Sequence, residues 1–413
     1  MSLISALFSG VSGLSGNSQA LNVIGDNVAN VNTVGYKGSK AIFGDILSVV
    51  LNNGASNMQI GRGSKLQSVV QSFGQGSFES TSNATDLALD GSGFFITKTS
   101  AGGTFYTRAG QFRLNDAGKL VSSNGDILQG FKITSGTSAT TLSGIDLAGV
   151  QSAPKASTEF TLGANLNGAA SAATTFSSPI TIFNSVGSQV VLNMNFTKQS
   201  GSNTWKFVAT PSAGTVTSGA SGTLSFNTSG QLSAVNGGAL ANLSIGISYA
   251  SSTPPAAAQT LTWKLVDSAG ASNGKMTGFA SPSNNNAFVQ DGFATGTLTG
   301  LSVDQQGIIS GLFDNGQTQK LFQVGLADFL APTGLSRKGN NLFAESAQSG
   351  QPVIGTAKTG GFGSVLGSTL ELSNVDLAGE FVIMIQTQQA FQANARVISS
   401  SNQLLTETVN LVR

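Results

Sequence analysis

The chain has 413 residues, with 20 Lys and Arg against 19 Asp and Glu, so its formal net charge is +1. Charged residues make up 9% of the chain, about a third of the share of roughly 25% in average proteins. This near neutrality gives no electrostatic field that would attract nucleic acid or an anionic membrane surface, and we expect the chain to bind neither.

The residue types that are missing exclude further classes of protein. The chain contains no His and no Cys. It therefore cannot form a zinc site with nitrogen and sulfur ligands, a Ser-His-Asp or Cys-His catalytic group, or a disulfide framework. Hydrophobic residues, at 39%, still suffice for folded domains. Because no stretch approaches the roughly 18 apolar residues that cross a bilayer, we expect no membrane insertion.

A regular apolar stripe runs through the first 31 residues. Its members are spaced by steps of three and four, with Ser18 and Gly25 in two of the positions. This spacing predicts a helix with a heptad seam, which ends at Asn30, Asn32 and Gly35. The predicted seam residues are Leu7, Val11, Leu14, Leu21 and Val28.

Short alternating segments separated by Gly, Asn and Ser fill the middle of the chain, which is typical of an all-β architecture. One turn pattern recurs, in which Asn or Asp is followed three residues later by Gly. The Asx residue favours a tight turn and Gly can adopt the left-handed conformation, so the pattern predicts hairpins and not metal ligands. It occurs in Leu114–Leu120, Phe226–Leu232 and Val303–Ile309, and Asp314-Asn315-Gly316 marks a fourth turn.

A second helix with the same stepping is predicted at the C-terminal end. Ser373 followed by Asp376 resembles a capping box, in which the hydroxyl accepts a backbone N–H and the carboxylate lies near the positive helix end. Gln388, Ala395 and Asn402 occupy positions within the stripe. The predicted seam residues are Leu377, Phe381, Met384, Phe391, Ile398 and Leu405. The faces opposite both stripes carry uncharged Ser, Asn and Gln, which suits packing against neighbouring copies.

Together these patterns predict an α+β protein with several domains. The terminal helices are expected to form a coiled-coil-like inner domain, with nested all-β domains of sandwich or barrel type outside it. The expected bounds are 1–71 plus 360–413 for the inner helical domain and its connecting segment, 72–144 plus 283–359 for a first β domain, and 145–282 for an inserted outer β domain.

Three patterns resemble active sites, and each fails on its spacing or context. Ser272 and Lys275 have Ser-x-x-Lys spacing but lie in a Gly-flanked turn and not on a helix. Asp86 and Asp90, four residues apart on a strand, are separated by about 13 Å, which is too far for glycoside chemistry. Residues 360–363, Gly-Gly-Phe-Gly, lack the Lys-Ser/Thr of a phosphate loop. We expect no enzyme activity, no cofactor and no metal.

Residues 22–37, NVIGDNVANVNTVGYK, resemble the N-terminal signature of bacterial flagellar rod and hook proteins, and residues 370–405 resemble the C-terminal signature. Internal stretches at 86–97, 107–131 and 300–329 agree with the same family. The signature residues are Asn27, Ala29, Asn30, Asn32, Thr33, Gly35, Tyr36 and Lys37 near the N-terminus, and Ser373, Asn374, Val375, Asp376 and Leu377 near the C-terminus.

The resemblance implies a structural subunit of the flagellar hook, which assembles into a flexible helical tube and transmits motor torque from rod to filament. A large inserted β domain favours hook over rod. The segment 182–207 is similar to that domain's Ser-Leu-Gly and Phe-x-Lys…Asn-x-Trp pattern, although Val186 replaces the Leu. The alternatives are the distal rod protein, a secreted β-rich adhesin or fibre, and an enzyme on polysaccharide that would use Asp86 or Asp90.

The resemblance also implies partners and a location. The partners would be many copies of the chain, the flagellar rod, hook cap and hook-filament junction proteins, and the type III export machinery. The location would be extracellular, in the hook and basal body, reached without a cleaved signal peptide. The residues agree with this last point, because the first basic residue is Lys37 and Ser, Gly and Asn interrupt the early apolar residues.

Overall fold

The computed structural model describes residues 3–52, 57–134, 136–201 and 203–411. They form two compact units. Unit 1 comprises the residues up to Gly149, Gly300–Gly311 and those from Gln319 onward, and unit 2 comprises Val150–Thr299 and Leu312–Thr318. Among the helices of these residues, none combines the length and apolar character that crossing a lipid bilayer requires.

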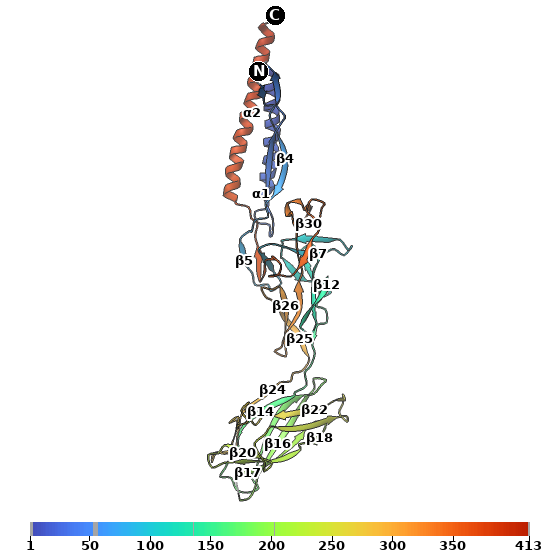
Figure 1. Ribbon diagram of the computed structural model, residues 1–413, viewed down its shortest axis with the longest axis vertical. Coiled ribbons are helices and arrows are strands. Elements are labelled where there is room, and N and C mark those ends of the chain that lie inside the picture. Colours follow the sequence, from blue (N-terminus) through green and yellow to red (C-terminus); the bar gives the residue numbers. More distant parts are fainter. Residues whose placement is uncertain (1–2, 53–56, 135, 202, 412–413) are drawn as a thin grey trace. The chain divides into compact units, whose positions relative to one another are not determined.

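Two long helices pair in unit 1, as the stepping of the apolar residues predicts. They are α1 (Leu3–Ala29) and α2 (Leu377–Leu411), drawn side by side in blue and red in Figure 1. A methyl group on Gly10 would lie 3.1 Å from Ile398, and one on Gly13 would lie 2.8 Å from the Asn394 side chain. The helices therefore run antiparallel, and glycine permits their close approach.

The start of α2 differs from the expected capping box. Its N-cap is Asp376, whose Oδ1 accepts the backbone N–H of Ala378 at 3.1 Å. The hydroxyl of Ser373 instead accepts the N–H of Val375 at 3.3 Å, in the turn that precedes the helix. The prediction of Ser373 as the cap was therefore wrong by three residues, although a carboxylate does lie at the positive helix end.

A β-hairpin, which the sequence analysis did not predict, lies along α1. Its strands are β1 (Ser39–Asp45) and β4 (Ser64–Gln71), and β2 (Val49–Asn52) and β3 (Asn57–Ile60) form a second antiparallel pair between them in the chain. The ring of Phe43 would lie 3.1 Å from a methyl group on Gly16, and the N–H of Ser64 donates to Ser12 Oγ at 3.3 Å. At these two contacts the hairpin packs on small residues of α1, Gly16 and Ser12.

The rest of unit 1 is a β structure around a Phe-rich core. Its main sheet has the order β26-β27-β11-β7-β8-β30-β29. The strands are β5 (Phe78–Ser80), β6 (Leu87–Asp90), β7 (Phe94–Lys98), β8 (Thr104–Thr107), β9 (Phe112–Leu114), β10 (Leu120–Ser122), β11 (Ile127–Thr134), β12 (Thr137–Gly144), β26 (Ile308–Phe313), β27 (Thr318–Val324), β28 (Leu326–Asp328), β29 (Ser336–Gly339), β30 (Leu342–Ala344), β31 (Val353–Gly355), β32 (Ser364–Gly367) and β33 (Thr369–Glu371), with a 3-10 turn η1 (Pro332–Gly334). Phe94 packs edge-on against Phe73, Phe329 and Phe343.

Unit 2 consists of two sheets that share one core. The strands of these sheets are β14 (Glu159–Asn165), β15 (Thr175–Phe183), β16 (Gln189–Lys198), β17 (Thr204–Pro211), β18 (Thr215–Ser218), β19 (Ser221–Phe226), β20 (Leu232–Val235), β21 (Leu243–Tyr249), β22 (Ala256–Trp263), β23 (Met276–Thr277) and β24 (Asn284–Gln290). Two further strands, β13 (Gln151–Ser152) and β25 (Gly296–Val303), pair with each other and belong to neither sheet, and β25 runs on into unit 1. One sheet has the order β18-β21-β22-β14-β23, with β24 also on β14, and the other β15-β16-β17-β19-β20.

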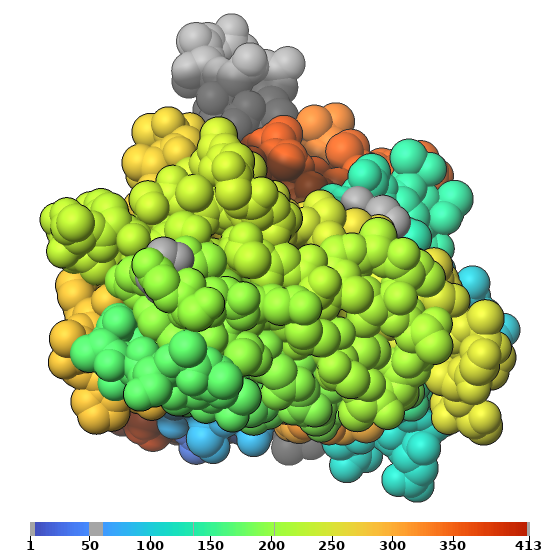
Figure 2. Space-filling view, turned by 90° about the horizontal axis from the view of Figure 1, so that it is seen from below, coloured from blue at the N-terminus to red at the C-terminus, as the bar shows by residue number. Residues whose placement is uncertain are grey.

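The core of unit 2 follows from the alternation of its strands. Along β16 the burial pattern alternates strictly, which places every second side chain inside. Trp205, Trp263 and Tyr249 are completely buried between the sheets. Figure 2 shows the surface that residues of this unit present, in green and yellow.

The unit boundaries differ from the expected ones at both edges of the inserted domain. Residues 283–299 were expected in the first β domain, but β24 pairs with β14 from Phe160 to Asn165 and so belongs to unit 2. Residues 145–149 were expected in the insert, but Ile145 is fully buried in unit 1 and its N–H donates to Leu128 O at 2.9 Å. In both places, strand pairing with distant residues decides the boundary.

The predicted hairpin turns are confirmed. In each of the three, the side-chain oxygen of the Asx residue accepts the N–H groups two and four residues later, and the Gly has φ between 71° and 73°; the Asx residues are Asn115, Asn227 and Asp304. Gly316 in the fourth turn has φ 76°. The Asp and Asn side chains thus satisfy backbone donors of their own turns.

Replacing a residue between the sheets tests the core of unit 2. Leu261 is fully buried there, so Leu261→Ala is expected to lower the free energy of unfolding by about 2–5 kcal/mol. Both Trp residues of the chain lie in this core, so Trp fluorescence during urea unfolding reports on this unit. Val208→Ala, at a side chain that is 37% exposed, is the control and should cost less than about 1 kcal/mol. Equal losses of unfolding free energy in the two variants would contradict the placement of Leu261 in the core of unit 2.

Acid should weaken unit 2 through Asp291. Burial alone would raise the pKa of this carboxyl, but hydrogen bonds from Thr158 and Glu159 and the nearby Lys155 outweigh burial, so the pKa lies well below its usual range. Because the folded-state pKa is depressed, the stabilisation is present above the unfolded pKa of about 4 and is lost as the pH falls below it. In urea titrations between pH 6 and pH 2, Asp291→Asn should show a smaller loss of stability than the unaltered chain; identical losses would exclude this role.

Candidate functional site

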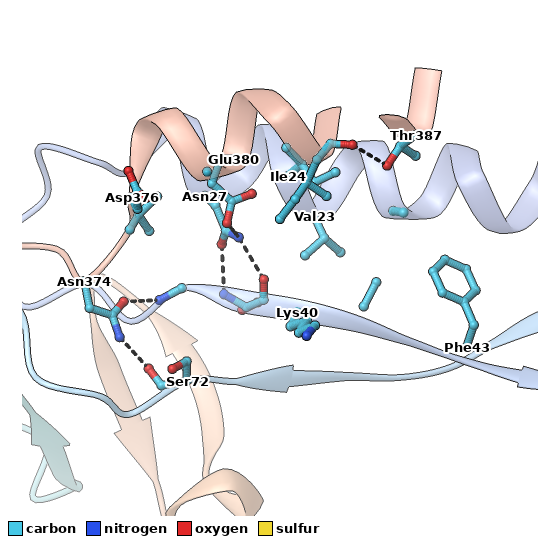
Figure 3. Close-up of a pocket in the computed structure, with 17 residues that line it drawn as sticks. Val23, Ile24, Asn27, Lys40, Phe43, Ser72, Asn374, Asp376, Glu380 and Thr387 are labelled. Atoms are coloured by element: carbon cyan, nitrogen blue, oxygen red, sulfur yellow. Dashed lines mark hydrogen bonds between the residues drawn. The ribbon is translucent and has the colours of Figure 1, made fainter. Parts of the chain in front are cut away.

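Asn27, in the last turn of α1, links three elements through one side chain. It is 2% exposed. Its Nδ2 donates to Ser39 O at 2.8 Å and to Glu380 Oε1 at 3.0 Å, and its Oδ1 accepts the N–H of Ser39 at 2.8 Å (Figure 3). The end of α1, the start of β1 and the first turns of α2 are therefore held together by a single amide.

The turn after α1 is built by the next signature residues. Asn30 Nδ2 donates to Asp26 O at 2.8 Å, and the Thr33 hydroxyl donates to Asn30 Oδ1 at 3.2 Å. Gly35 has φ 68°, and a methyl group on it would come within 2.5 Å of Ala109 N. Glycine is thus required here both by its conformation and by the close passage of a backbone from the β part of unit 1. The remaining members, Ala29 and Asn32, are exposed.

Tyr36 is buried and joins the helix end to the β part. Its hydroxyl donates to Asp26 Oδ2 at 3.0 Å, and the Arg337 guanidinium lies 5.5 Å from its ring centroid. Arg337 also lies 3.7 Å from Asp26 Oδ2. Burial, with Asp26 adding to it and Arg337 opposing it, raises the pKa of Tyr36 above its ordinary value. The hydroxyl therefore stays protonated and available as a donor.

A buried cluster of three charges lies beside this turn. Glu371, on β33, has a fully buried side chain, and its Oε1 is 2.7 Å from Lys37 Nζ. Its Oε2 is 3.4 Å from Arg108 Nη1. Lys37 also donates to Gly74 O at 2.8 Å, and Arg108 to Gly91 O at 2.8 Å. The segment after α1, the segment before α2 and the strand region after β8 (Thr104–Thr107) thus meet at one carboxylate.

The charged state of Lys37 and Arg108 in this cluster depends on the carboxylate of Glu371. Burial lowers the pKa of Lys37, and the charge and hydrogen bond of Glu371 oppose that shift. Burial likewise lowers the pKa of Arg108, with Glu371 again opposing. Two cations therefore depend on one carboxylate, and a buried charge that loses its partner is strongly destabilising.

Asn374, in the C-terminal signature, links separate backbone segments through its side-chain amide, as Asn27 does in the N-terminal signature. Its Oδ1 accepts the N–H of Gly38 at 2.8 Å, and its Nδ2 donates to Ser72 O at 2.8 Å and Gly74 O at 3.0 Å. Val375, its neighbour, would lie 3.2 Å from a methyl group on Gly38. The two signatures are therefore two halves of one junction, in which each fixes the backbone of the other.

A groove lies next to this junction, between α1, β1 and α2 (Figure 3). Its volume is about 400 Å³. Val23 and Ile24 from α1, Phe43 from β1 and Ile383 from α2 give it apolar walls, and Asp376 and Lys40 lie at its edge. Its lining is mainly hydrocarbon, which suits an apolar side chain more than a polar small molecule.

On α2, the side chains that are covered within the chain coincide only in part with the predicted seam. Met384, Phe391, Ile398 and Leu405 are partly covered within the chain. Between them the chain covers Thr387, Asn394 and Ser401, whereas Gln388 and Asn402 are exposed. At the start of the helix, Leu377 is 40% and Phe381 46% exposed. The covered stripe thus contains small and polar residues.

On α1 the predicted seam also lies beside the most covered stripe. Leu7, Leu14, Leu21 and Val28 are partly covered, and Val11 is 48% exposed. The most buried positions of the helix are Gly10, Gly16, Ala20, Ile24 and Asn27. Within the chain, therefore, α1 meets α2 and the hairpin mainly through small residues.

Sequence reasoning missed Glu371 and Arg108, the two charges that complete the cluster around Lys37. Both lie inside stretches whose resemblance was noted, at 370–405 and 107–131. In a chain with so few charges, a Glu flanked by two Leu residues, as in Leu370-Glu371-Leu372, is the available signal for a buried ion pair. Asp86 and Asp90 show no such cluster: Asp86 accepts hydrogen bonds from Thr81 and Asn83, and Asp90 is exposed.

Comparisons with known proteins agree along the chain. Family models match at residues 7–37 (flagella basal body rod protein), 88–153 (flagellar hook protein FlgE/F/G D1 domain), 150–293 (flagellar basal body protein FlaE D2 domain) and 367–411 (flagellar basal body rod FlgEFG protein C-terminal). The flagellar hook protein FlgE of Borreliella burgdorferi is 33% identical over 99% of this chain and 100% of its own length. That of Escherichia coli K12 is 32% identical over 97% and 98%. The chain belongs to the flagellar hook protein family.

The solved structures include a similar hook protein. The crystal structure of Helicobacter pylori flagellar hook protein FlgE2 is 14% identical, with a TM-score of 0.45, over 71% of this chain and 100% of that one. Members of the hook protein family are structural proteins, not enzymes, and form homopolymers. The present hook protein is accordingly a structural subunit of the flagellar hook, located at the hook and basal body of the flagellum.

Removing the shared carboxylate tests the junction of this hook protein. Glu371→Gln leaves Lys37 and Arg108 buried without a counter-charge, so the free energy of unfolding of unit 1 should fall by about 3–5 kcal/mol. Chemical denaturation followed by far-UV circular dichroism, with hydrogen exchange of β5 and β33, measures this. Glu79→Gln on β5, the strand that pairs with β33, is the matched control; because Glu79 is exposed, it should change stability by less than about 0.5 kcal/mol. A Glu371→Gln chain as stable as this control would refute the role of the cluster.

Proposed function

We propose that this chain assembles through its terminal helices into the flexible helical tube of the flagellar hook, which transmits motor torque from the rod to the filament. The observation that carries the proposal is the apolar surface that α2 leaves uncovered within one copy. Leu377, Phe381, Val382, Ile383 and Ile385 are each between 40% and 55% exposed.

The distribution of these residues indicates an interior environment. Five apolar side chains among nine consecutive positions surround the helix on several faces, and a helix that is apolar on all sides belongs inside a structure. Full burial of such a side chain is worth about 1.5–3 kcal/mol, and because each of these is already about half covered, completing its burial is worth roughly half of that. Because the family is homopolymeric, other copies of the chain are the natural cover. The predicted seam residues Leu7, Val11, Leu14, Leu21, Val28, Leu377, Phe381, Met384, Phe391, Ile398 and Leu405 are proposed as members of these contacts.

The signature residues serve this function as a joint. They fix the end of α1 and the start of α2 to the β part of unit 1 through Asn27, Asn374 and the Lys37–Glu371 ion pair. Torque carried by packed helices must pass through these two connections to reach the outer parts of the same copy. A joint held by buried hydrogen bonds and ion pairs resists that load better than a linker whose side chains make no such contacts.

The low charge of the chain suits a tube that bends. We propose three functional parts: the helices with their hairpin, the β part of unit 1, and unit 2 as the outer part. When the tube bends, outer parts of neighbouring copies slide past one another. Surfaces rich in Ser, Thr, Gly and Ala offer few ion pairs to break, and an exposed pair contributes only about 0–1 kcal/mol.

The further partners are proposed from the family resemblance. They are the flagellar rod, hook cap and hook-filament junction proteins, together with the type III export machinery, which would carry the chain out of the cell without a cleaved signal peptide. The distal rod protein is the less favoured alternative, because hook proteins match over nearly the whole chain, including the D2 segment.

A charge placed on the exposed apolar surface should prevent assembly without unfolding the chain. Ile385 is 54% exposed, so Ile385→Glu is expected to raise the protein concentration needed for polymerisation at least about tenfold, since a desolvated charge costs more than 1.4 kcal/mol. Sedimentation and electron microscopy of the purified chain measure this. Gln348→Glu, at an exposed loop residue of unit 1, adds the same charge and should leave assembly unchanged. If both variants polymerise like the unaltered chain, α2 is not an assembly surface.

A further inference from the structure

The groove beside the junction has the dimensions and lining of a socket for apolar side chains. Its volume of about 400 Å³ lies in the range of about 300–1,000 Å³ that is usual for binding pockets. Val23 and Ile24 line it from α1 and Phe43 lines it from β1 (Figure 3). Ile383 lines it from α2. Ile383 is 48% exposed and Phe43 42% exposed, so this lining is not covered within the chain.

The other end of α1 carries a matching apolar ridge. Phe8 is 64% exposed and Val11 48% exposed. Three residues apart on a helix, they lie on the same face. The next residues of that face, Ser15 and Asn22, are also exposed, and they are small or polar. The ridge is therefore a short apolar feature on an otherwise polar stripe, and it contacts no core of its own chain.

We propose that Phe8 and Val11 of one copy insert into the groove between α1, β1 and α2 of a second copy. This inference rests on the proposed function, and it names the contact through which the helices assemble. It is the helix-in-groove mode of recognition, in which apolar side chains at spacings of three and four residues fill a hydrophobic cleft.

Three observations favour this occupant. A chain cannot fill its own groove, because Phe8 and Val23 are separated on one straight helix by 15 residues, or about 22 Å. The sequence before Asp26 contains no charged residue, so α1 can enter the groove without desolvating a charge. The exposed apolar residues at the start of α2, Leu377 to Ile385, form an α2 ridge that is a weaker candidate for the occupant of the groove. Ile383 of this ridge already lines the groove.

The positions of the ridge and groove permit an open assembly. Ridge and groove are different surfaces at different ends of α1, so copies that dock head to tail leave one ridge and one groove free in each pair. Such a contact is heterologous and continues into an open helical assembly. Reciprocal docking of two antiparallel copies would fill both grooves and close into a dimer, and sedimentation distinguishes that dimer from a polymer.

Disulfide trapping tests the contact directly, because the chain has no Cys of its own. Two single variants, Phe8→Cys and Ile383→Cys, are mixed with each other and polymerised under reducing conditions. As controls, each variant alone is mixed with an excess of the unaltered chain and polymerised in the same way. Mild oxidation should give a cross-linked dimer in the polymer of the Phe8→Cys and Ile383→Cys mixture, and none in the monomeric mixture. A disulfide requires Cα atoms within about 4.4–6.8 Å, so random collisions are a poor source of this product.

The outcomes separate this inference from the proposed function. If polymers form and the two variants do not cross-link, the groove assignment is overturned while assembly through the helices stands. If Ile383→Cys instead cross-links with Ile385→Cys, the α2 ridge is the occupant and the assignment is again overturned. If the unaltered chain forms no polymer at all, it is the proposed function that fails.

Truncation provides an independent readout. Phe8→Ala removes an exposed side chain, so the fold of the copy should be unaffected, while the critical concentration for polymerisation should rise at least about tenfold. Ser15→Ala, on the same exposed face of α1, should change it less than twofold. Equal critical concentrations for Phe8→Ala and Ser15→Ala would refute the insertion of Phe8.

Discussion

Glu371 holds together three segments that are far apart in the chain, and the geometry of the junction depends on its carboxylate. Its oxygens meet Lys37 and Arg108, the N–H of Gly76 donates to it at 3.0 Å, and its own carbonyl accepts the N–H of Gly35 at 2.8 Å. Each of these partners lies hundreds of residues earlier. A residue that must reach so many groups at once fixes where α1 ends, where α2 begins and how both meet the β part of unit 1.

This constraint explains why few charges suffice for the fold. In a chain with 9% charged residues, the ion pair of Lys37 with Glu371 is completely buried, whereas Lys264 and Glu159 form a half-exposed pair. A buried pair is specific because its components cannot be satisfied elsewhere, and an exposed pair adds little. The chain thus uses charge to define one joint, and uses amides such as Asn27 and Asn374, which need no counter-ion, for the rest of it.

Local patterns could be read from the sequence, and long-range pairing could not. The Asx-x-x-Gly turns at Asn115, Asn227 and Asp304 were predictable because the side chain and the Gly act within five residues. Both terminal helices were predictable from the stepping of their apolar residues. The pairing of β24 with β14 and the partner of Lys37 were missed, because each depends on which distant segment lies alongside. The cap was placed at Ser373 instead of Asp376 for a local reason, since both side chains accept an N–H two residues later. Within one copy, Gln388 of α2 is exposed and its neighbour Thr387 is partly covered, so the seam predicted through Gln388 is not the stripe that this copy covers.

The helices approach each other through small residues and leave several large apolar ones exposed, such as Phe8, Val382 and Ile385, which is unusual in a self-contained domain. Gly10 and Gly13 of α1 meet Asn394 and Ile398 of α2, a contact that removes little hydrocarbon from water. A pair of helices held in this way gains little from packing to offset the conformational entropy that ordering the 35 residues of α2 costs. In the assembly proposed above, copies that cover the exposed side chains would stabilise only the helical state, so helix stability and assembly would be linked by mass action. The junction around Glu371 would hold the end of α1 and the start of α2 in place while neighbouring copies cover the rest.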